Sequence, residues 1–480
     1  MSWDITPSSA QGSGFKWVVW SSLVVFILLL ALFVRANSYF IADDYDHFIQ
    51  AAHLPLLQML STPIDVHYAP LHNLFSALIL YSAPLDFDVA LLVLLSFHGL
   101  SVWLLYKLLQ ALSDSPANLL IVLLYACNPF LLHPLIWWSA GIHRFPYIFL
   151  CLASLHAYVH YRQSRRPLHL ACCYLAFFLA FGFYSKAILI PLYILGLELC
   201  LSVRERGRLL ARFAPGGVML LVSIGYVLWY LNFAPVMRQG PAPSIAVAGD
   251  ILLLNFKVMA GVLSFHRHDA PSVFNLALVV LLLLGILYSL SKDRRALPIW
   301  LVLFACVGVN FAMVAASGRG QMFGAFLAFA LRYYFEVMFL VAIFGGMLLG
   351  VLRTRSEPAV KPRHWVAWVV CVFYLSALSW VGSSYFFALY DKSNVATAHY
   401  MGRLLTDLDG LPAERPLLLA EASFPGYVYG DFINTLMPMA KVLPLRYPHL
   451  AIVPRAQADY AVDETGAVVA LHAAGARAGP

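Results

Sequence analysis

The sequence predicts a mainly α-helical membrane protein: a polytopic bundle of about eleven transmembrane helices with a small outer α/β C-terminal region. Of its 480 residues, 61% are hydrophobic and only 11% are charged, whereas soluble proteins average about half and about a quarter. The apolar residues gather in long uncharged runs, and the basic residues lie in short clusters between them. The formal charge of +7 therefore indicates membrane topology, and no nucleic-acid partner is expected.

The chain opens with residues 1–14, which are small and polar and are expected to form a disordered cytoplasmic tail. Residues 17–34 carry no charge and can cross most of a hydrocarbon layer about 30 Å thick at ~1.5 Å per residue. A cleaved signal peptide is the alternative, but the many apolar runs that follow favour an uncleaved helix. Residues 70–84 form a short run expected to lie at the interface. Further spans are expected over residues 87–110, 116–134, 144–162, 168–184, 187–203, 213–233, 273–290, 297–316, 333–352 and 365–386.

The basic clusters predict the topology. With the N-terminus in the cytoplasm of a bacterial inner membrane, all of them fall on the cytoplasmic side, as the positive-inside rule requires. The loops 37–70 and 234–272 and the C-terminus then lie outside, on the periplasmic side. The clusters are Arg162–Arg166, Arg204–Arg208, Lys292–Arg295 and Arg353–Arg363.

Composition divides the chain into a transmembrane domain over residues 15–390 and a more ordinary region over 391–470. The second region has one helical stretch and short apolar runs between turn residues, so a small extracytoplasmic α/β unit is expected. Residues 471–480 are expected to be disordered. The seven cysteines lie inside apolar runs without metal-ligand spacing and are interpreted as small hydrophobic residues.

An acidic cluster stands where the first helix leaves the bilayer. Asp43, Asp44 and Asp46 lie within a few residues of one another, beside His47, in a chain with few charges. Solvated loop carboxylates are the plain alternative. Ionisable groups at the mouth of a helix bundle nevertheless indicate a functional site, and a short tether to a rigid helix suits a catalytic base.

Cations on the same predicted side suit an anionic lipid headgroup, because Lys and Arg supply the point charges and forked donors that a phosphate needs. Each could instead be an interfacial anchor whose charged end reaches the headgroups. Lys186, Arg332 and Arg144 are predicted to hold the phosphate. His67, His133, His143 and Arg319 are predicted to contact the rest of the substrate. The chain has no P-loop, HExxH or paired CxxC motif.

In the order and spacing of five segments, the chain resembles the GT-C superfamily of polyprenyl-phosphate-sugar-dependent glycosyltransferases. It is most similar to bacterial relatives of the protein O-mannosyltransferases and of the transmembrane tetratricopeptide-repeat mannosyltransferases. The segments are ADDY (Ala42–Tyr45), YAPLHNL (Tyr68–Leu74), NPFLLHPLIWWSAGIHR (Asn128–Arg144), YSKAILIPLYILGLEL (Tyr184–Leu199) and ALRYYFEVMFLVAIFGG (Ala330–Gly346).

The chain also departs from these relatives. They often have Asp-Glu where this chain has Asp43-Asp44, an acid at the position of Ala187, and Arg at the position of Ala69. The C-terminal region lacks a tetratricopeptide pattern.

The resemblance implies an inverting hexosyl- or pentosyltransferase that moves a sugar from a polyprenyl-phosphate donor to a hydroxyl of an extracytoplasmic glycan, lipid or protein. Asp43 would be the general base, and Asp44 would orient the acceptor or bind a divalent metal cation. Two other classes stay open: a transporter or flippase of a lipid-linked sugar, and a protein like the O-antigen polymerases and ligases.

Overall fold

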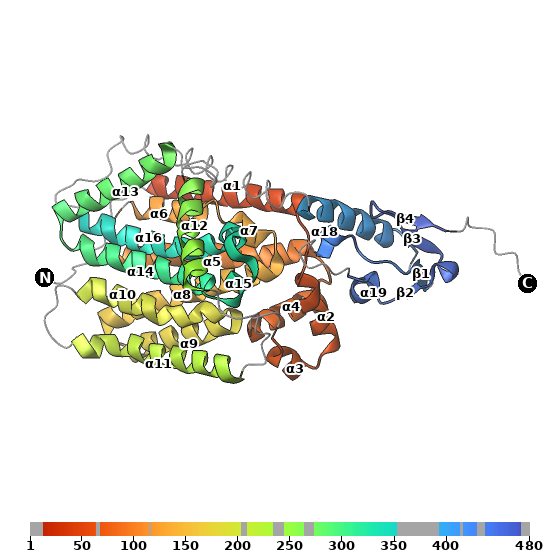
Figure 1. Ribbon diagram of the computed structural model, residues 1–480, viewed down its shortest axis with the longest axis horizontal. Helices are drawn as coiled ribbons and strands as arrows, with labels where there is room; N and C mark the ends of the chain where they lie inside the picture. The colour runs from red at the N-terminus through yellow and green to blue at the C-terminus, as the bar shows by residue number, and fades with distance from the viewer. Residues whose placement is uncertain are drawn as a thin grey trace, which may run out of the picture.

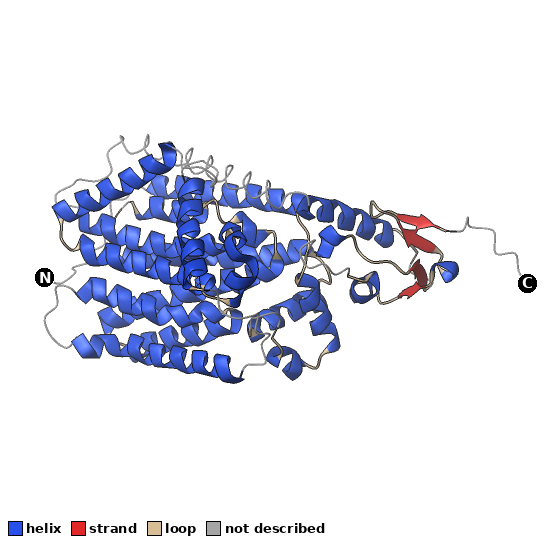
Figure 2. Cartoon of the chain, in the orientation of Figure 1, coloured by secondary structure: helices blue, strands red, loops and turns tan. Residues whose placement is uncertain are grey.

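The computed structural model describes residues 13–63, 68–113, 115, 117–202, 209–233, 244–263, 273–352, 393–412, 416–429 and 437–471. Long helices lie side by side, and a small sheet stands at one end of them (Figures 1 and 2). The helices up to residue 202 are α1 (Ser13–Asn37), α2 (Asp44–His53), α3 (Leu56–Ser61), α4 (Pro70–Ser82), α5 (Phe87–Leu112), α6 (Asn118–Ala126), α7 (Leu132–Leu135), α8 (Trp138–Ser164), α9 (Pro167–Phe183), η1 (Ser185–Leu189) and α10 (Ile190–Ser202). They are followed by α11 (Leu209–Phe233), α12 (Ile245–Leu263), α13 (Val273–Lys292), α14 (Ala296–Ala315), α15 (Gly318–Phe323), η2 (Gly324–Phe329) and α16 (Arg332–Leu352).

The prediction of a mainly α-helical membrane protein is confirmed. Within the described residues, seven helices are long and apolar enough to cross a membrane, and α9 and most of α13 (Leu276–Lys292) are shorter apolar helices. Large apolar side chains on their outer faces are exposed, as lipid-facing positions require. The predicted span 365–386 lies outside the described residues, as do the predicted tails apart from their inner edges.

The predicted single span over residues 116–134 is wrong. The helix α6 ends at Ala126, and the short α7 follows after a turn. Asn128 makes this turn: its side-chain amide donates to the Tyr125 carbonyl (2.6 Å), and its Oδ1 accepts from the Phe130 amide (3.1 Å). Since a residue before proline avoids the helical region, Asn128-Pro129 ends the helix.

The prediction that residues 234–272 form a loop is also wrong, because Ile245–Leu263 forms the helix α12. Asp250 and Lys257 interrupt its apolar sequence, which concealed the helix. Its length and composition suit a span, but it runs across the direction of α14 and α16 rather than along it (Figure 1). It therefore does not simply add one crossing to the predicted topology.

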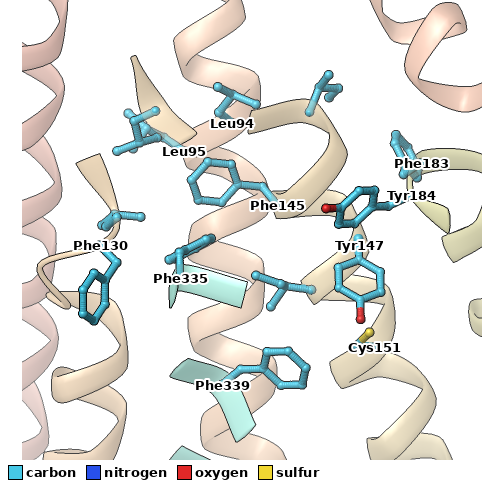
Figure 3. Packing of buried hydrophobic residues seen from close by; sticks show 14 of the residues in the cluster. Leu94, Leu95, Phe130, Phe145, Tyr147, Cys151, Phe183, Tyr184, Phe335 and Phe339 are labelled. Carbon is cyan, nitrogen blue, oxygen red and sulfur yellow. The ribbon is translucent and has the colours of Figure 1, made fainter. Parts of the chain in front are cut away.

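Aromatic side chains fill the centre of the bundle between α5, α8 and α16. Phe145 of α8 packs against Phe335 of α16 with ring centroids 5.0 Å apart, and Leu94 and Leu95 of α5 lie beside them (Figure 3). All four side chains are buried. This apolar contact fixes α8 and α16 side by side, so polar residues at their ends are brought together.

The predicted small α/β region at the C-terminus is confirmed. Its sheet has the order β2-β1-β3-β4, in which β1 is parallel to β2 and β3, and β3 is antiparallel to β4. Its elements are a helix over residues 393–409, β1 (Leu417–Ala420), α18 (Gly426–Tyr429), α19 (Met439–Val442), η4 (Leu443–Leu445), β2 (Leu450–Val453), η5 (Arg455–Gln457), β3 (Tyr460–Val462) and β4 (Val468–Ala470).

The two ends of the helix bundle differ. The helices α2 to α4 and the C-terminal sheet lie at one end, and the turn between α13 and α14 lies at the other (Figure 1). The acidic turn before α2 and the C-terminal region thus share one end of the molecule.

Candidate active site

The turn before α2 carries two adjacent carboxylates with different surroundings. Asp43 is half-buried, and its Oδ1 accepts hydrogen bonds from Trp137 Nε1 (2.8 Å) and Ser139 Oγ (2.7 Å). In the described part of the chain, no hydrogen bond reaches Oδ2 of Asp43. This oxygen can therefore accept a proton while Oδ1 holds the carboxylate in place.

Asp44 is instead fully buried. Its Oδ1 accepts from the Ser139 backbone amide (2.7 Å), and its Oδ2 accepts from the Ile41 amide (3.0 Å). Burial raises the pKa of Asp44 well above its usual range, and the Asp43 carboxylate raises it further, whereas the two backbone amides lower it. Asp44 thus joins the turn to the start of α8.

Asp44 was also predicted as a metal ligand. Both of its oxygens are used by backbone amides, and the described residues contain no group of three or more His, Cys, Asp or Glu side chains placed to hold a metal ion. A cation at Asp44 would need further ligands from the substrate phosphate, and the role of Asp44 as a metal ligand stays a prediction.

A close approach of α7 to α8 brings Trp137 to the acidic turn. A Cβ atom at Gly141 would stand 2.4 Å from the Pro134 carbonyl oxygen and 2.6 Å from Leu94 Cδ1. Only glycine leaves room for this contact. The segment from His133 to Trp137 therefore lies against the first turn of α8.

Trp137 links the carboxylate to a cation. The Arg332 guanidinium lies 4.8 Å from the Trp137 ring centroid, while the indole nitrogen of Trp137 donates to Asp43. Arg332 also donates to His133 Nε2 (3.1 Å), and the His133 ring stacks on Trp137 with centroids 6.3 Å apart. Because arginine only donates, this nitrogen of His133 carries no proton.

Behind Arg332, its neighbour Tyr333 lies among the other predicted cations. Arg144 and Lys186 lie 5.4 Å and 5.3 Å from the Tyr333 ring centroid, within cation–π range. Arg319 donates to the Tyr333 hydroxyl (3.4 Å). The four predicted cations, drawn from α8, η1, α15 and α16, thus surround one aromatic ring.

Glu336 pairs with two of these cations. Its carboxylate is fully buried, forms an ion pair with Arg144 at 2.5 Å and a shorter one with Lys186, and accepts from the Tyr184 hydroxyl at 3.1 Å. Arg144 and Lys186 are themselves 3% exposed, so they lie beneath the surface while Arg332 and Arg319 are half-buried.

Glu336 is not among the site residues predicted from the sequence. The signal was present, because Glu336 is the only acidic residue of α16 and stands one helical turn after Arg332. An acid inside an apolar helix needs a partner, and here it has two.

His143 lies elsewhere, in a row of three imidazoles behind the turn. Its Nδ1 donates to the Phe183 carbonyl (2.6 Å), so its Nε2 accepts from His72 Nδ1 (3.2 Å). The ring of His47 stacks on His72 with centroids 3.8 Å apart. The Nδ1 of His47 donates to Asn73 Oδ1 (3.2 Å). The row therefore binds α2, α4 and α8 together. The predicted substrate residue His67 lies outside the described residues.

The fold and these contacts define an integral membrane protein with a carboxylate and a group of cations at one end of its helix bundle. No protein-family model matches the sequence, and no curated protein matches it significantly. Among the solved structures that resemble the chain is ArnT from Cupriavidus metallidurans bound to undecaprenyl phosphate. The two chains are 14% identical, and the match covers 92% of this chain and 86% of ArnT at a TM-score of 0.48.

Proposed function

We propose that this protein is a membrane glycosyltransferase of the GT-C type. It transfers a sugar from a polyprenyl-phosphate donor to a hydroxyl group of an extracytoplasmic acceptor. The observation that carries this proposal is the contact of Trp137 with both Asp43 and Arg332: the proton acceptor lies at the edge of one indole ring, and the phosphate-binding cation lies over its face.

The half-buried Arg332 and Arg319 contact the donor phosphate. Each guanidinium presents several donors in a fixed plane, which matches the oxygens of a phosphate. The buried Arg144 and Lys186 lie against the Tyr333 ring, beneath the protein surface. Together with the Glu336 carboxylate they carry one positive charge in excess. This positive charge attracts an anion bound beside Tyr333. The attraction becomes stronger when water leaves the site, because the effective dielectric constant falls.

Asp43 is the general base. Its Oδ2 takes the proton of the acceptor hydroxyl while the hydroxyl oxygen attacks the anomeric carbon of the sugar. The new bond joins the acceptor oxygen to the anomeric carbon, and the bond from that carbon to the phosphate oxygen breaks. The electron pair of the broken bond leaves with the polyprenyl phosphate, and Arg332 and Arg319 stabilise its growing charge. Attack opposite the leaving group inverts the anomeric centre.

The resemblance in the sequence supports the same class, since the resembling segments contain Asp43, Arg144, Lys186 and Arg332. Arg319 lies outside these segments and is proposed from its contact with Tyr333 alone. The competing class is a transporter of a lipid-linked sugar, because buried charges also line transport paths. The two classes differ in whether a covalent bond is made.

The experiment is a reconstitution of the purified protein in liposomes with a radiolabelled polyprenyl-phosphate sugar and a membrane extract as the source of acceptor. We expect label in a new covalent product, which would also identify the acceptor. Label that crosses the bilayer and stays on the lipid phosphate would instead establish transport and overturn the proposal.

A further inference from the structure

The turn that presents Asp43 is held in an unfavourable backbone conformation. Ala42, the residue before Asp43, has φ +52°, in the left-handed region that residues other than glycine rarely adopt. Such a conformation persists only where its surroundings hold it. Within the turn, the Asp44 amide donates to the Ile41 carbonyl (3.1 Å). The Ile41 amide also donates to Asp44 Oδ2 (3.0 Å), and Ser139 donates to both carboxylates, so α8 holds the turn from one side.

The C-terminal region supplies contacts to this turn from outside the membrane bundle. The amide of Ala42 donates to the Val428 carbonyl (3.4 Å). The ring of Tyr45, two residues after Asp43, stacks on Phe424 with centroids 6.1 Å apart and an interplanar angle of 12°. Tyr45 and Phe424 are 0% and 1% exposed, so the stack excludes water.

These contacts are themselves anchored in the C-terminal region. The Phe424 amide donates to the Met437 carbonyl (2.9 Å), and the Val428 amide donates to the Pro425 carbonyl beside Phe424 (2.9 Å). The Phe424 ring packs edge-on against Tyr400 with ring centroids 6.5 Å apart. Phe424 and Val428 are thereby fixed to the segment before α19 and to the helix over residues 393–409. In Figure 1, α18 lies at the base of the C-terminal region beside the bundle, and the sheet lies beyond it.

We propose that Phe424 and the Val428 carbonyl are positioning groups for the reaction: the C-terminal region holds the turn from Ala42 to Tyr45 so that Asp43 points at the acceptor. The proposal rests on the function proposed above. Neither group touches substrate; both act through the placement of Asp43. A base that is displaced by about 1 Å can lose roughly a hundredfold in rate, so this support affects turnover.

The test compares Phe424→Leu with Leu419→Ala. Phe424→Leu removes the ring and keeps an apolar side chain. Leu419, in β1, is fully buried in the sheet, so Leu419→Ala also weakens the C-terminal region but leaves the contacts of the turn in place. Both variants are purified as full chains in nanodiscs. The readouts are kcat, the KM for the labelled donor, and hydrogen–deuterium exchange of the peptide that contains residues 42–47.

We expect Phe424→Leu to lower kcat at least about tenfold, with the donor KM within about twofold of the wild-type value. Exchange over residues 42–47 should accelerate at least about tenfold in Phe424→Leu and stay near the wild-type rate in Leu419→Ala. Equal loss of kcat in both variants, in step with the amount of folded protein, would show a merely structural role and overturn the proposal.

The exchange measurement keeps this inference separate from the proposed function. If the wild-type protein transfers no sugar, the proposed function fails, but the exchange rates still show whether Phe424 holds the turn. Unchanged exchange in Phe424→Leu would overturn the positioning role whatever the activity.

Discussion

At the scale of single residues, the adjacent carboxylates of Asp43 and Asp44 differ in the hydrogen bonds that they accept. Asp44 accepts from two backbone amides, which uses it to hold the turn against α8. Asp43 accepts two side-chain hydrogen bonds through one oxygen, which keeps the other oxygen available. This difference in environment is why Asp43 rather than Asp44 is proposed as the base.

Arg332 provides the first prediction. Arg332→Gln should weaken binding of a polyprenyl-phosphate sugar by about 2–5 kcal/mol, because the phosphate loses a partly buried charged partner. Arg166→Gln, an exposed change in a predicted cytoplasmic cluster, should leave binding unchanged. Binding of the labelled donor in detergent measures both. Equal affinity in the two variants would remove Arg332 from the phosphate site.

His47 provides a prediction about pH. Burial lowers the pKa of His47 from 6.5 to about 4, an effect that Asp43 and Asn73 partly oppose. The unfolded chain therefore takes up a proton that the folded chain resists, and stability is lost as the pH falls from about 6.5 toward 4. The free energy of unfolding should therefore fall less between pH 6.5 and 4 in His47→Gln than in the wild-type protein, by up to roughly 3 kcal/mol. Thermal unfolding of both proteins across that window measures it, and parallel curves would contradict the account.

At the scale of elements, Glu336 joins α8, η1 and α16 through Arg144, Lys186 and Tyr184. Glu336→Gln leaves two buried cations without their carboxylate, and such a loss costs about 3–5 kcal/mol. We expect a clear fall in the unfolding temperature of the detergent-solubilised protein.

The matched control is Asp293→Asn, which breaks the pair between Asp293 and Arg295 at the turn after α13. These side chains are 23% and 31% exposed, and pairs that water reaches contribute about 0–1 kcal/mol. An effect of Glu336→Gln as small as that of Asp293→Asn would show that the three elements are held by apolar packing alone.

The sequence predicted the long helices because uncharged apolar runs determine them directly. The break after Ala126 was missed because apolar residues continue through it, although Asn128-Pro129 is a helix-ending signal in the sequence. The helix α12 was missed because Asp250 and Lys257 interrupt its apolar pattern. It identified Asp43, Arg144, Lys186 and Arg332 by charge and by resemblance. It did not predict that Trp137 would bridge Asp43 to Arg332, because that contact depends on how α8 packs against α16.

At the scale of the whole molecule, the contact of Ala42 with Val428 requires the acidic turn and the C-terminal region to share one side of the membrane. The positive-inside rule predicts that both lie outside. Reporter fusions after Asp391 should therefore report an extracytoplasmic location, and fusions after Lys292 a cytoplasmic one. A cytoplasmic signal after Asp391 would contradict both the topology and the proposed positioning of the turn.

The central claim is that Asp43 is the base of a sugar transfer, and the most direct test is the turnover of Asp43→Asn. Asparagine keeps the shape and the hydrogen bonds from Trp137 and Ser139 but cannot accept the proton. The same charge change at Asp88, an exposed residue paired with Arg35 at 3.0 Å, is the control. We predict that Asp43→Asn lowers the transfer rate by roughly 10²–10⁴ with donor affinity unchanged, while Asp88→Asn transfers at the wild-type rate. Transfer by Asp43→Asn at the wild-type rate would contradict the account.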